Sequence, residues 1–127
     1  MSKLVGCSLI IKDDFNNVLV VKKKVKRGQK EEWSLVNQKA RSKESAEKCV
    51  NRGAKDILKS IVFDLKSLNE YVVNEENDEV IMTFSGTLKE RITLDKNYKE
   101  YKWVNNVQLE NYEIKEFDKQ ILNDFLR

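Results

Sequence analysis

The sequence contains no histidine and no proline among its 127 residues. Without histidine, the chain lacks the general base of Ser-His and Cys-His catalysis and the usual nitrogen ligand of zinc. Any catalysis must therefore come from carboxylates, lysines, tyrosines or a metal ion held by oxygen ligands. Without proline, tight turns depend on glycine, asparagine and aspartate.

Cysteine is scarce, and long apolar runs are absent. Cys7 lies in a predicted strand and Cys49 in a predicted helix. We interpret both as buried thiols, because nothing in the sequence indicates a disulfide framework or a metal-binding pair. Lys12, Asp13 and Asp14 interrupt the N-terminal apolar segment before a signal-peptide core develops. We therefore expect a cytoplasmic protein that does not associate with membranes.

Length and charge narrow the class of protein further. A chain of 127 residues with 40% hydrophobic residues suits one globular domain, and we expect that domain to span residues 1–127 without a linker or repeat. The formal net charge is only +3. Bulk charge therefore gives no reason to expect a nucleic-acid partner.

The hydrophobic periodicity predicts strands around one central helix. Apolar residues recur every three or four positions across residues 44–61, which predicts a helix with Ser42 or Ser45 as its N-cap. The predicted strands are residues 5–12, 18–26 as the hairpin partner of the first, 33–36, 71–73, 79–88 and 101–104. The apolar face of the helix comprises Ala46, Cys49, Val50, Gly53, Ala54, Ile57, Leu58 and Ile61.

A second, C-terminal helix completes the expected architecture. Its apolar face consists of Phe117, Ile121, Leu122 and Phe125. The order of elements predicts an α+β fold in which helices pack on a mixed β-sheet. We expect residues 18–21 and 80–84 to share that sheet.

One segment resembles a known motif. Residues 38–60 align without a gap with the Nudix box, G-x5-E-x7-R-E-U-x-E-E-x-G-U, in which U is a bulky aliphatic residue. Gln38 stands at the first glycine, Glu44 and Arg52 match the glutamate and arginine, and Asp56 matches in charge. The flanking WSLVNQ (33–38) and EYKWV (100–104) resemble the W-x-L-P-G-G and E-x-x-W-V segments of that superfamily.

The chain therefore resembles MutT-like Nudix hydrolases over nearly its whole length. The resemblance implies the Nudix fold, a mixed sheet sandwiched between helices. It also implies hydrolysis of a diphosphate bond in nucleoside diphosphate derivatives, assisted by magnesium that is held by helix carboxylates.

The carboxylates that the resemblance calls for are mostly replaced. Gly53 and Ile57 stand at two glutamate positions, Asp56 is shorter than the glutamate at its position, and Lys59 replaces a glycine. We expect weak magnesium binding at most. The remaining candidate metal ligands are Asp56, Glu44 and Glu100.

Other side chains are candidates for contact with a ligand: Gln38, Lys22, Lys24, Trp33 and Glu100. The lysines present positive charge to a phosphate, and Trp33 offers a ring for stacking on a base. Simpler interpretations exist for most of these candidates. The lysines can protect a hairpin edge from aggregation, and Trp33 can belong to the core. Arg52 can pair with Asp56 on the helix surface, and the negative charge of Glu44 can interact favourably with the N-terminal end of the helix dipole.

Three functions follow from these observations. The first is a Nudix domain that retains Glu44, Arg52 and Asp56 as vestiges of the catalytic set and binds a nucleotide-type small molecule or a protein with little or no hydrolysis. The second is an active magnesium-dependent hydrolase that uses substitute carboxylates, namely Glu47, Glu79 and Glu100. The third is a structural or interaction module, a homodimer included. The altered box favours the first.

Overall fold

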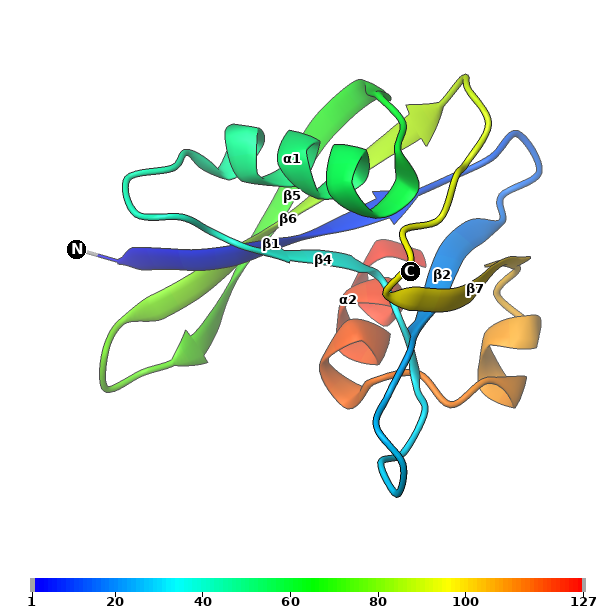
Figure 1. Ribbon diagram of the computed structural model, residues 1–127. Coiled ribbons are helices and arrows are strands. Elements are labelled where there is room, and N and C mark those ends of the chain that lie inside the picture. The colour runs from blue at the N-terminus through cyan, green and yellow to red at the C-terminus, as the bar shows by residue number, and fades with distance from the viewer. Residues whose placement is uncertain (1, 127) are drawn as a thin grey trace.

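The computed structural model describes residues 2–126, in which seven strands and two α-helices form (Figure 1). The elements in chain order are β1 (Lys3–Ile11), β2 (Val18–Lys23), β3 (Trp33–Ser34), β4 (Val36–Lys39), α1 (Ala46–Leu58), β5 (Val62–Asn74), β6 (Glu79–Leu88), β7 (Tyr98–Val104), a short 3-10 helix (Gln108–Asn111) and α2 (Glu116–Leu126). None of the helices in this part of the chain is long and apolar enough to cross a bilayer.

The strands form two sheets. The first has the order β4-β1-β6-β5, in which β1 and β6 are parallel and the other pairs are antiparallel. The second has the order β3-β2-β7 and is antiparallel. Residues 18–21 and 80–84 therefore lie in different sheets, contrary to our expectation, and β2 is not the hairpin partner of β1. The chain crosses between sheets at the turn after β1, where Lys12 and Val18 form an isolated bridge.

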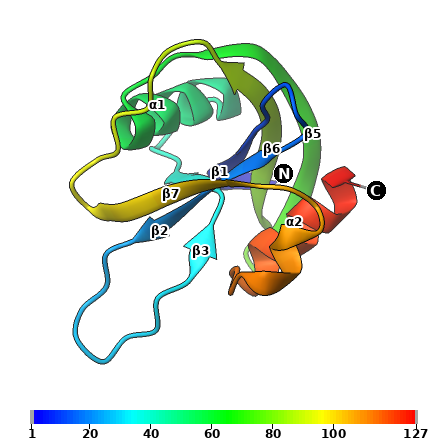
Figure 2. The same cartoon turned by 90° about the vertical axis from the view of Figure 1, so that its right-hand side faces the viewer.

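Helices cover the strands from opposite sides, as Figure 2 shows. Alternate side chains of β1 contribute to two cores: Leu9 and Ile11 pack with residues of α1, whereas Ile10 packs with residues of α2. Strands that are buried on both faces are apolar at nearly every position, which explains the continuous apolar runs of β1 and β2. The predicted architecture, in which a mixed β-sheet is sandwiched between helices, is confirmed.

Helix α1 is shorter than its periodicity predicted. Ser45 is the N-cap, and its hydroxyl accepts a hydrogen bond from the backbone N–H of Lys48 at 3.2 Å. The helix ends at Leu58 because Lys59 adopts the left-handed conformation, with φ 53° and ψ 40°. We predicted that Ile61 belongs to the buried face of the helix. That prediction is wrong, because Ile61 lies beyond the end of α1 and is 60% exposed.

Most strand boundaries also differ from the predictions. Strand β1 spans Lys3–Ile11 and not residues 5–12, and β7 begins at Tyr98 and not at residue 101. Strand β5 begins at Val62, well before the predicted residues 71–73, because its charged and polar positions obscure the apolar alternation. Strand β2 ends at Lys23 and not at residue 26. The predicted strand at residues 33–36 is divided between β3 and β4, with Leu35 between them.

Candidate functional site

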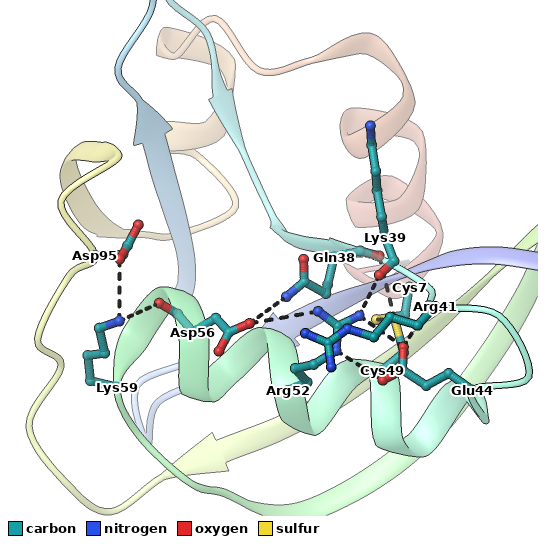
Figure 3. Close-up of polar contacts among 10 residues, drawn as sticks. All are labelled: Cys7, Gln38, Lys39, Arg41, Glu44, Cys49, Arg52, Asp56, Lys59 and Asp95. Carbon is teal, nitrogen blue, oxygen red and sulfur yellow. Dashed lines mark hydrogen bonds and ion pairs between the residues drawn. The ribbon is translucent and has the colours of Figure 1, made fainter.

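Residues 38–60, the segment that resembles the Nudix box, begin on β4 and continue into α1, and Gln38 of β4 lies beside Asp56 of α1 (Figure 3). Gln38 lies on β4 against the middle of α1, where Gly53 faces it. A Cβ atom on Gly53 would lie 3.0 Å from the Cβ of Gln38 and 3.5 Å from its Cγ. Gln38 therefore occupies the space that a side chain at position 53 would need.

Glu44 and Arg52 form a bidentate ion pair beside this contact. The Nε and Nη2 atoms of Arg52 each donate to the Glu44 carboxylate at 2.9 Å, and Nη2 also donates to the Lys39 carbonyl at 2.6 Å. The hydrogen bonds from Arg52, followed by that from the Arg41 backbone N–H, lower the pKa of Glu44 to about 2. Glu44 is therefore an anion near neutral pH, and the pair ties the helix to the preceding loop.

Asp56 lies one helical turn after Arg52 and is half exposed. Its Oδ2 atom accepts a hydrogen bond from Nε2 of Gln38 at 3.2 Å and lies 3.7 Å from Nη1 of Arg52. The pairing of Arg52 and Asp56 predicted for the helix surface thus forms. The same arginine contacts both Glu44 and Asp56.

Glu100 lies in a different region of the surface. It is on β7 opposite Lys22, whose Nζ is 3.8 Å from Oε1 of Glu100 and 3.7 Å from Oε2 of Glu31. The Lys22 ammonium also stands 4.6 Å from the ring centre of Trp33. Trp33 is buried and packs edge-on against Tyr112, so its ring is part of the core. The exposed Lys24 follows β2, and its backbone N–H donates to the Asn97 carbonyl.

The carboxylates do not fit a divalent-cation site as they are arranged. Glu44 is held by Arg52 and a backbone N–H, Asp56 by an amide and the same arginine, and Glu100 by a lysine. Within residues 2–126, no three aspartate, glutamate or cysteine side chains gather closely enough to hold a metal ion. Glu47 is in the exposed first turn of α1, and Glu79 begins β6 in register with Lys3.

A cavity of about 630 Å³ opens between β1, β4 and the start of α2, a volume in the ordinary range for small-molecule sites. Asp118 of α2 lines it and is only 4% exposed. Its Oδ2 atom accepts hydrogen bonds from the backbone N–H of Leu35 at 3.0 Å and from Nδ2 of Asn37 at 2.9 Å. The Ser8 hydroxyl in turn donates to Oδ1 of Asn37.

Leu35, which immediately precedes β4, and Asn37 of β4 thus hold the Asp118 carboxylate in place. Burial raises the pKa of Asp118, and the hydrogen bonds from Asn37 and Leu35 offset part of that rise. Buried charges are costly unless they are well paired. A carboxylate in this position has free energy to gain from a hydrogen-bond donor that enters the cavity.

Both apolar and basic side chains line the rest of this cavity. Tyr98, Phe117 and Ile81 supply ring and aliphatic surface, and Lys23, Lys39 and Lys115 supply positive charge. Glu32 adds one acidic side chain to the same lining. A second cavity of about 350 Å³ adjoins the first and shares Lys23, Gln38 and Tyr98 with it. Asp56, Lys59 and Asp95 line this second cavity, where Nζ of Lys59 is 3.3 Å from Oδ1 of Asp95.

The sequence candidates are therefore only partly brought together. Gln38 lines both cavities and Asp56 lines the second, whereas the other candidates line neither: Glu44, Arg52, Lys22, Lys24, Trp33 and Glu100.

Comparison with solved structures decides the fold. The chain superimposes on a solved structure from work on MutT of Aliivibrio salmonicida and Vibrio cholerae. The TM-score is 0.80 at 14% identity, over 96% of this chain and 96% of that one. It superimposes on a Nudix hydrolase from Nitrosomonas europaea with a TM-score of 0.78 at 14% identity, over 98% of this chain and 88% of that one. The chain adopts the Nudix fold.

A third solved structure with the Nudix fold contains a ligand. The Nudix domain of Shewanella oneidensis NrtR, in complex with ADP-ribose, matches with a TM-score of 0.73 at 13% identity, over 97% of this chain and 86% of that domain. No family model matches this sequence, and no curated protein matches it either. Among these comparisons, the similarity to Nudix proteins is therefore seen in the structure.

Asp118 is not among the candidate residues predicted from the sequence. The signal was present, because Asp118 precedes Ile121 and Leu122 by three and four residues and so lies on the apolar face of α2. A charged residue on an apolar face requires a buried partner. Its partners at Leu35 and Asn37 are more than 80 residues away, so only the fold reveals them.

Proposed function

We propose that this protein binds a nucleoside-diphosphate-type ligand in the cavity lined by Asp118 and hydrolyses little or none of it. The observation that carries the proposal is the buried Asp118 carboxylate, which backbone and side-chain donors orient at the wall of a cavity of about 630 Å³. A fixed carboxylate recognises N–H groups such as those at the edge of a nucleobase.

The remaining walls suit the other parts of such a ligand. Tyr98 and Phe117 offer ring surface to a base or a ribose, and the lysines of both cavities offer positive charge to phosphate oxygens. The ADP-ribose bound by the Shewanella Nudix domain is a ligand of this chemical class. ADP-ribose is therefore the first ligand to test.

The arrangement of residues 38–60, which resemble the Nudix box, supports the proposal of weak or absent hydrolysis. Gly53 and Ile57 carry no carboxylate, and Glu44 and Asp56 are engaged by Arg52 and Gln38. A diphosphate and its metal ions need several fixed anionic oxygens. Losing one preorganised group of this kind commonly costs a few kcal/mol of transition-state stabilisation, and each 1.36 kcal/mol is about tenfold in rate.

Calorimetric and thermal-shift titrations test the proposal with ADP-ribose, NAD, nucleoside diphosphate sugars and nucleoside triphosphates. A ligand at 100 times its dissociation constant stabilises a protein by about 2.7 kcal/mol, which is readily measured. We expect at least one compound to bind, and we expect Asp118→Asn to weaken that binding. Asp14→Asn, in an exposed turn, is the matched control and should bind as the parent does.

Product release from the same compounds, measured with magnesium or manganese, separates binding from turnover. We expect no appreciable hydrolysis. Turnover with kcat/KM of about 10⁴ M⁻¹s⁻¹ or more, as for ordinary enzymes, would instead support the active hydrolase. Absence of binding by every compound would favour the interaction module.

A further inference from the structure

The fold brings the two cysteines into contact. Cys7 is on β1 and Cys49 is on α1, 42 positions later, and their Sγ atoms are 3.1 Å apart. That separation is only about 1 Å longer than the 2.05 Å of a disulfide bond. Both thiols are free and buried. Sequence spacing gave no sign of this pairing.

One of the two cysteines is within reach of a small molecule. Cys7 lines the cavity of about 630 Å³ that opens to the surface, whereas Cys49 lies behind it in the core under α1. Burial raises the pKa of both thiols, which keeps them protonated and slow to react at rest. The nearby charge of Glu44 also raises the pKa of each thiol, and that of Arg52 lowers it. A reagent that enters the cavity therefore meets Cys7 first.

We propose that Cys7 and Cys49 are a reversible oxidation site, at which a hydroperoxide that enters the cavity converts the two thiols into an intramolecular disulfide. The Cys7 sulfur attacks the terminal peroxide oxygen as its thiol loses a proton, the O–O bond breaks, and the leaving alkoxide or hydroxide takes up that proton. Cys7 becomes a sulfenic acid. The Cys49 sulfur then attacks the sulfenic sulfur and displaces its oxygen, which leaves as water.

The electrons and atoms balance in this sequence. Two thiols lose two electrons and two protons, the peroxide gains both, and the products are the disulfide and either two waters or one water and an alcohol. Small dithiols such as dithiothreitol reverse the reaction by thiol–disulfide exchange.

Disulfide formation would connect the redox state to the ligand cavity. The Cys49 Sγ lies 3.6 Å from the carbonyl oxygen of Gln38, and Gln38 lines both cavities. A covalent link between β1 and α1 also closes a long loop and removes entropy from the unfolded chain. We expect the oxidised protein to melt on the order of 10 °C higher than the reduced protein.

The test uses the unmodified protein. Reduced protein is treated with a modest excess of hydrogen peroxide under native conditions, and the remaining thiols are then alkylated in denaturant. Intact mass spectrometry should show the loss of two hydrogen atoms and no alkylation, and a non-reducing digest should contain the peptide pair linked by Cys7 and Cys49. Dithiothreitol should restore both thiols and the lower melting temperature.

Single-cysteine variants provide the control. Cys49→Ser should gain oxygen on Cys7 and show no rise in melting temperature with peroxide, and Cys49→Ala serves if serine is not tolerated in the core. The proposal is overturned if the unmodified protein, still folded, keeps two alkylatable thiols after peroxide. It is equally overturned if its cysteines gain two or three oxygens, or link separate chains, in place of pairing.

Discussion

Gln38 and Gly53 fill one space between them: a Cβ atom on Gly53 would lie 3.0 Å from the Cβ of Gln38. The Nudix box has glycine at the first of these positions and glutamate at the second. This chain has the large side chain on the strand and glycine on the helix. The exchange explains how a glycine persists inside α1, where it costs roughly 1 kcal/mol relative to alanine.

Coupling between positions 38 and 53 is the first prediction. Helix propensity alone predicts that Gly53→Ala raises the free energy of unfolding by roughly 1 kcal/mol. We expect a smaller gain, because the new methyl group crowds Gln38. In a Gln38→Gly background the same change should be more favourable by about 1 kcal/mol, as a double-mutant cycle from urea unfolding would measure. Asn51→Ala, at an exposed position of α1, is the control and should behave alike in both backgrounds. Additivity at positions 38 and 53 would show that the contact carries no strain.

A second prediction concerns metal binding. The triple variant Gln38→Gly, Gly53→Glu and Ile57→Glu restores the residue types of the box and vacates the space that a glutamate at position 53 needs. We expect it to bind manganese at least tenfold more tightly than the parent. Without Gln38→Gly, the gain should be smaller. Ile57 is buried, so the variant should lose stability, on the order of 3 kcal/mol.

Isothermal calorimetry measures the affinities, and circular dichroism verifies that the variants fold. Equal manganese affinity in the double and triple variants would contradict the steric part of this prediction.

The third prediction concerns the end of α1. Lys59 adopts φ 53°, a left-handed conformation that costs a residue with a side chain about 1–2 kcal/mol and glycine almost nothing. Lys59→Gly should therefore stabilise the protein by about 0.5–1 kcal/mol, despite the loss of the half-exposed ion pair with Asp95. Lys59→Ala loses the same ion pair but keeps the strain, so it should show no gain. Urea midpoints compare the three proteins, and a gain from alanine equal to that from glycine would refute the role of φ.

These residues also illustrate how far the sequence could lead. The period of α1 and the apolar runs of β1 and β2 predicted the helix and the strands, because each reflects local geometry. The gapless spacing of Glu44 and Arg52 carried the resemblance that implied the Nudix fold. The end of α1 was predicted wrongly because lysine, unlike glycine, is not a residue that signals a left-handed helix end. The contacts of Asp118 with Leu35 and of Cys7 with Cys49 join distant segments, so no local pattern encodes them.

The fourth prediction is a pH dependence from Glu44. Its pKa falls from an ordinary value of about 4.5 to about 2 in the folded protein, mainly through Arg52. A depressed folded pKa contributes stability above the unfolded pKa, and that stability is lost as the pH falls toward 2. Glu44→Gln should therefore melt below the parent at pH 7, and the difference should shrink between about pH 4.5 and 2. Glu47→Gln, in the exposed first turn of α1, is the control for the loss of a surface carboxylate. A constant gap between parent and Glu44→Gln would contradict the assignment.

The last prediction separates stability from binding at Asp118. Burial raises its pKa, so its contribution to stability is fully present below the unfolded pKa and is lost as the pH rises through the folded value. Asn cannot ionise, yet its side-chain oxygen can still accept the hydrogen bonds from Leu35 and Asn37. Asp118→Asn should therefore melt above the parent near neutral pH, with an advantage that grows as the pH rises from about 4. Loss of a charged acceptor should weaken ligand binding about tenfold or more. A variant that is less stable at pH 7 and binds equally well would show that the carboxylate serves only to hold α2 against β4.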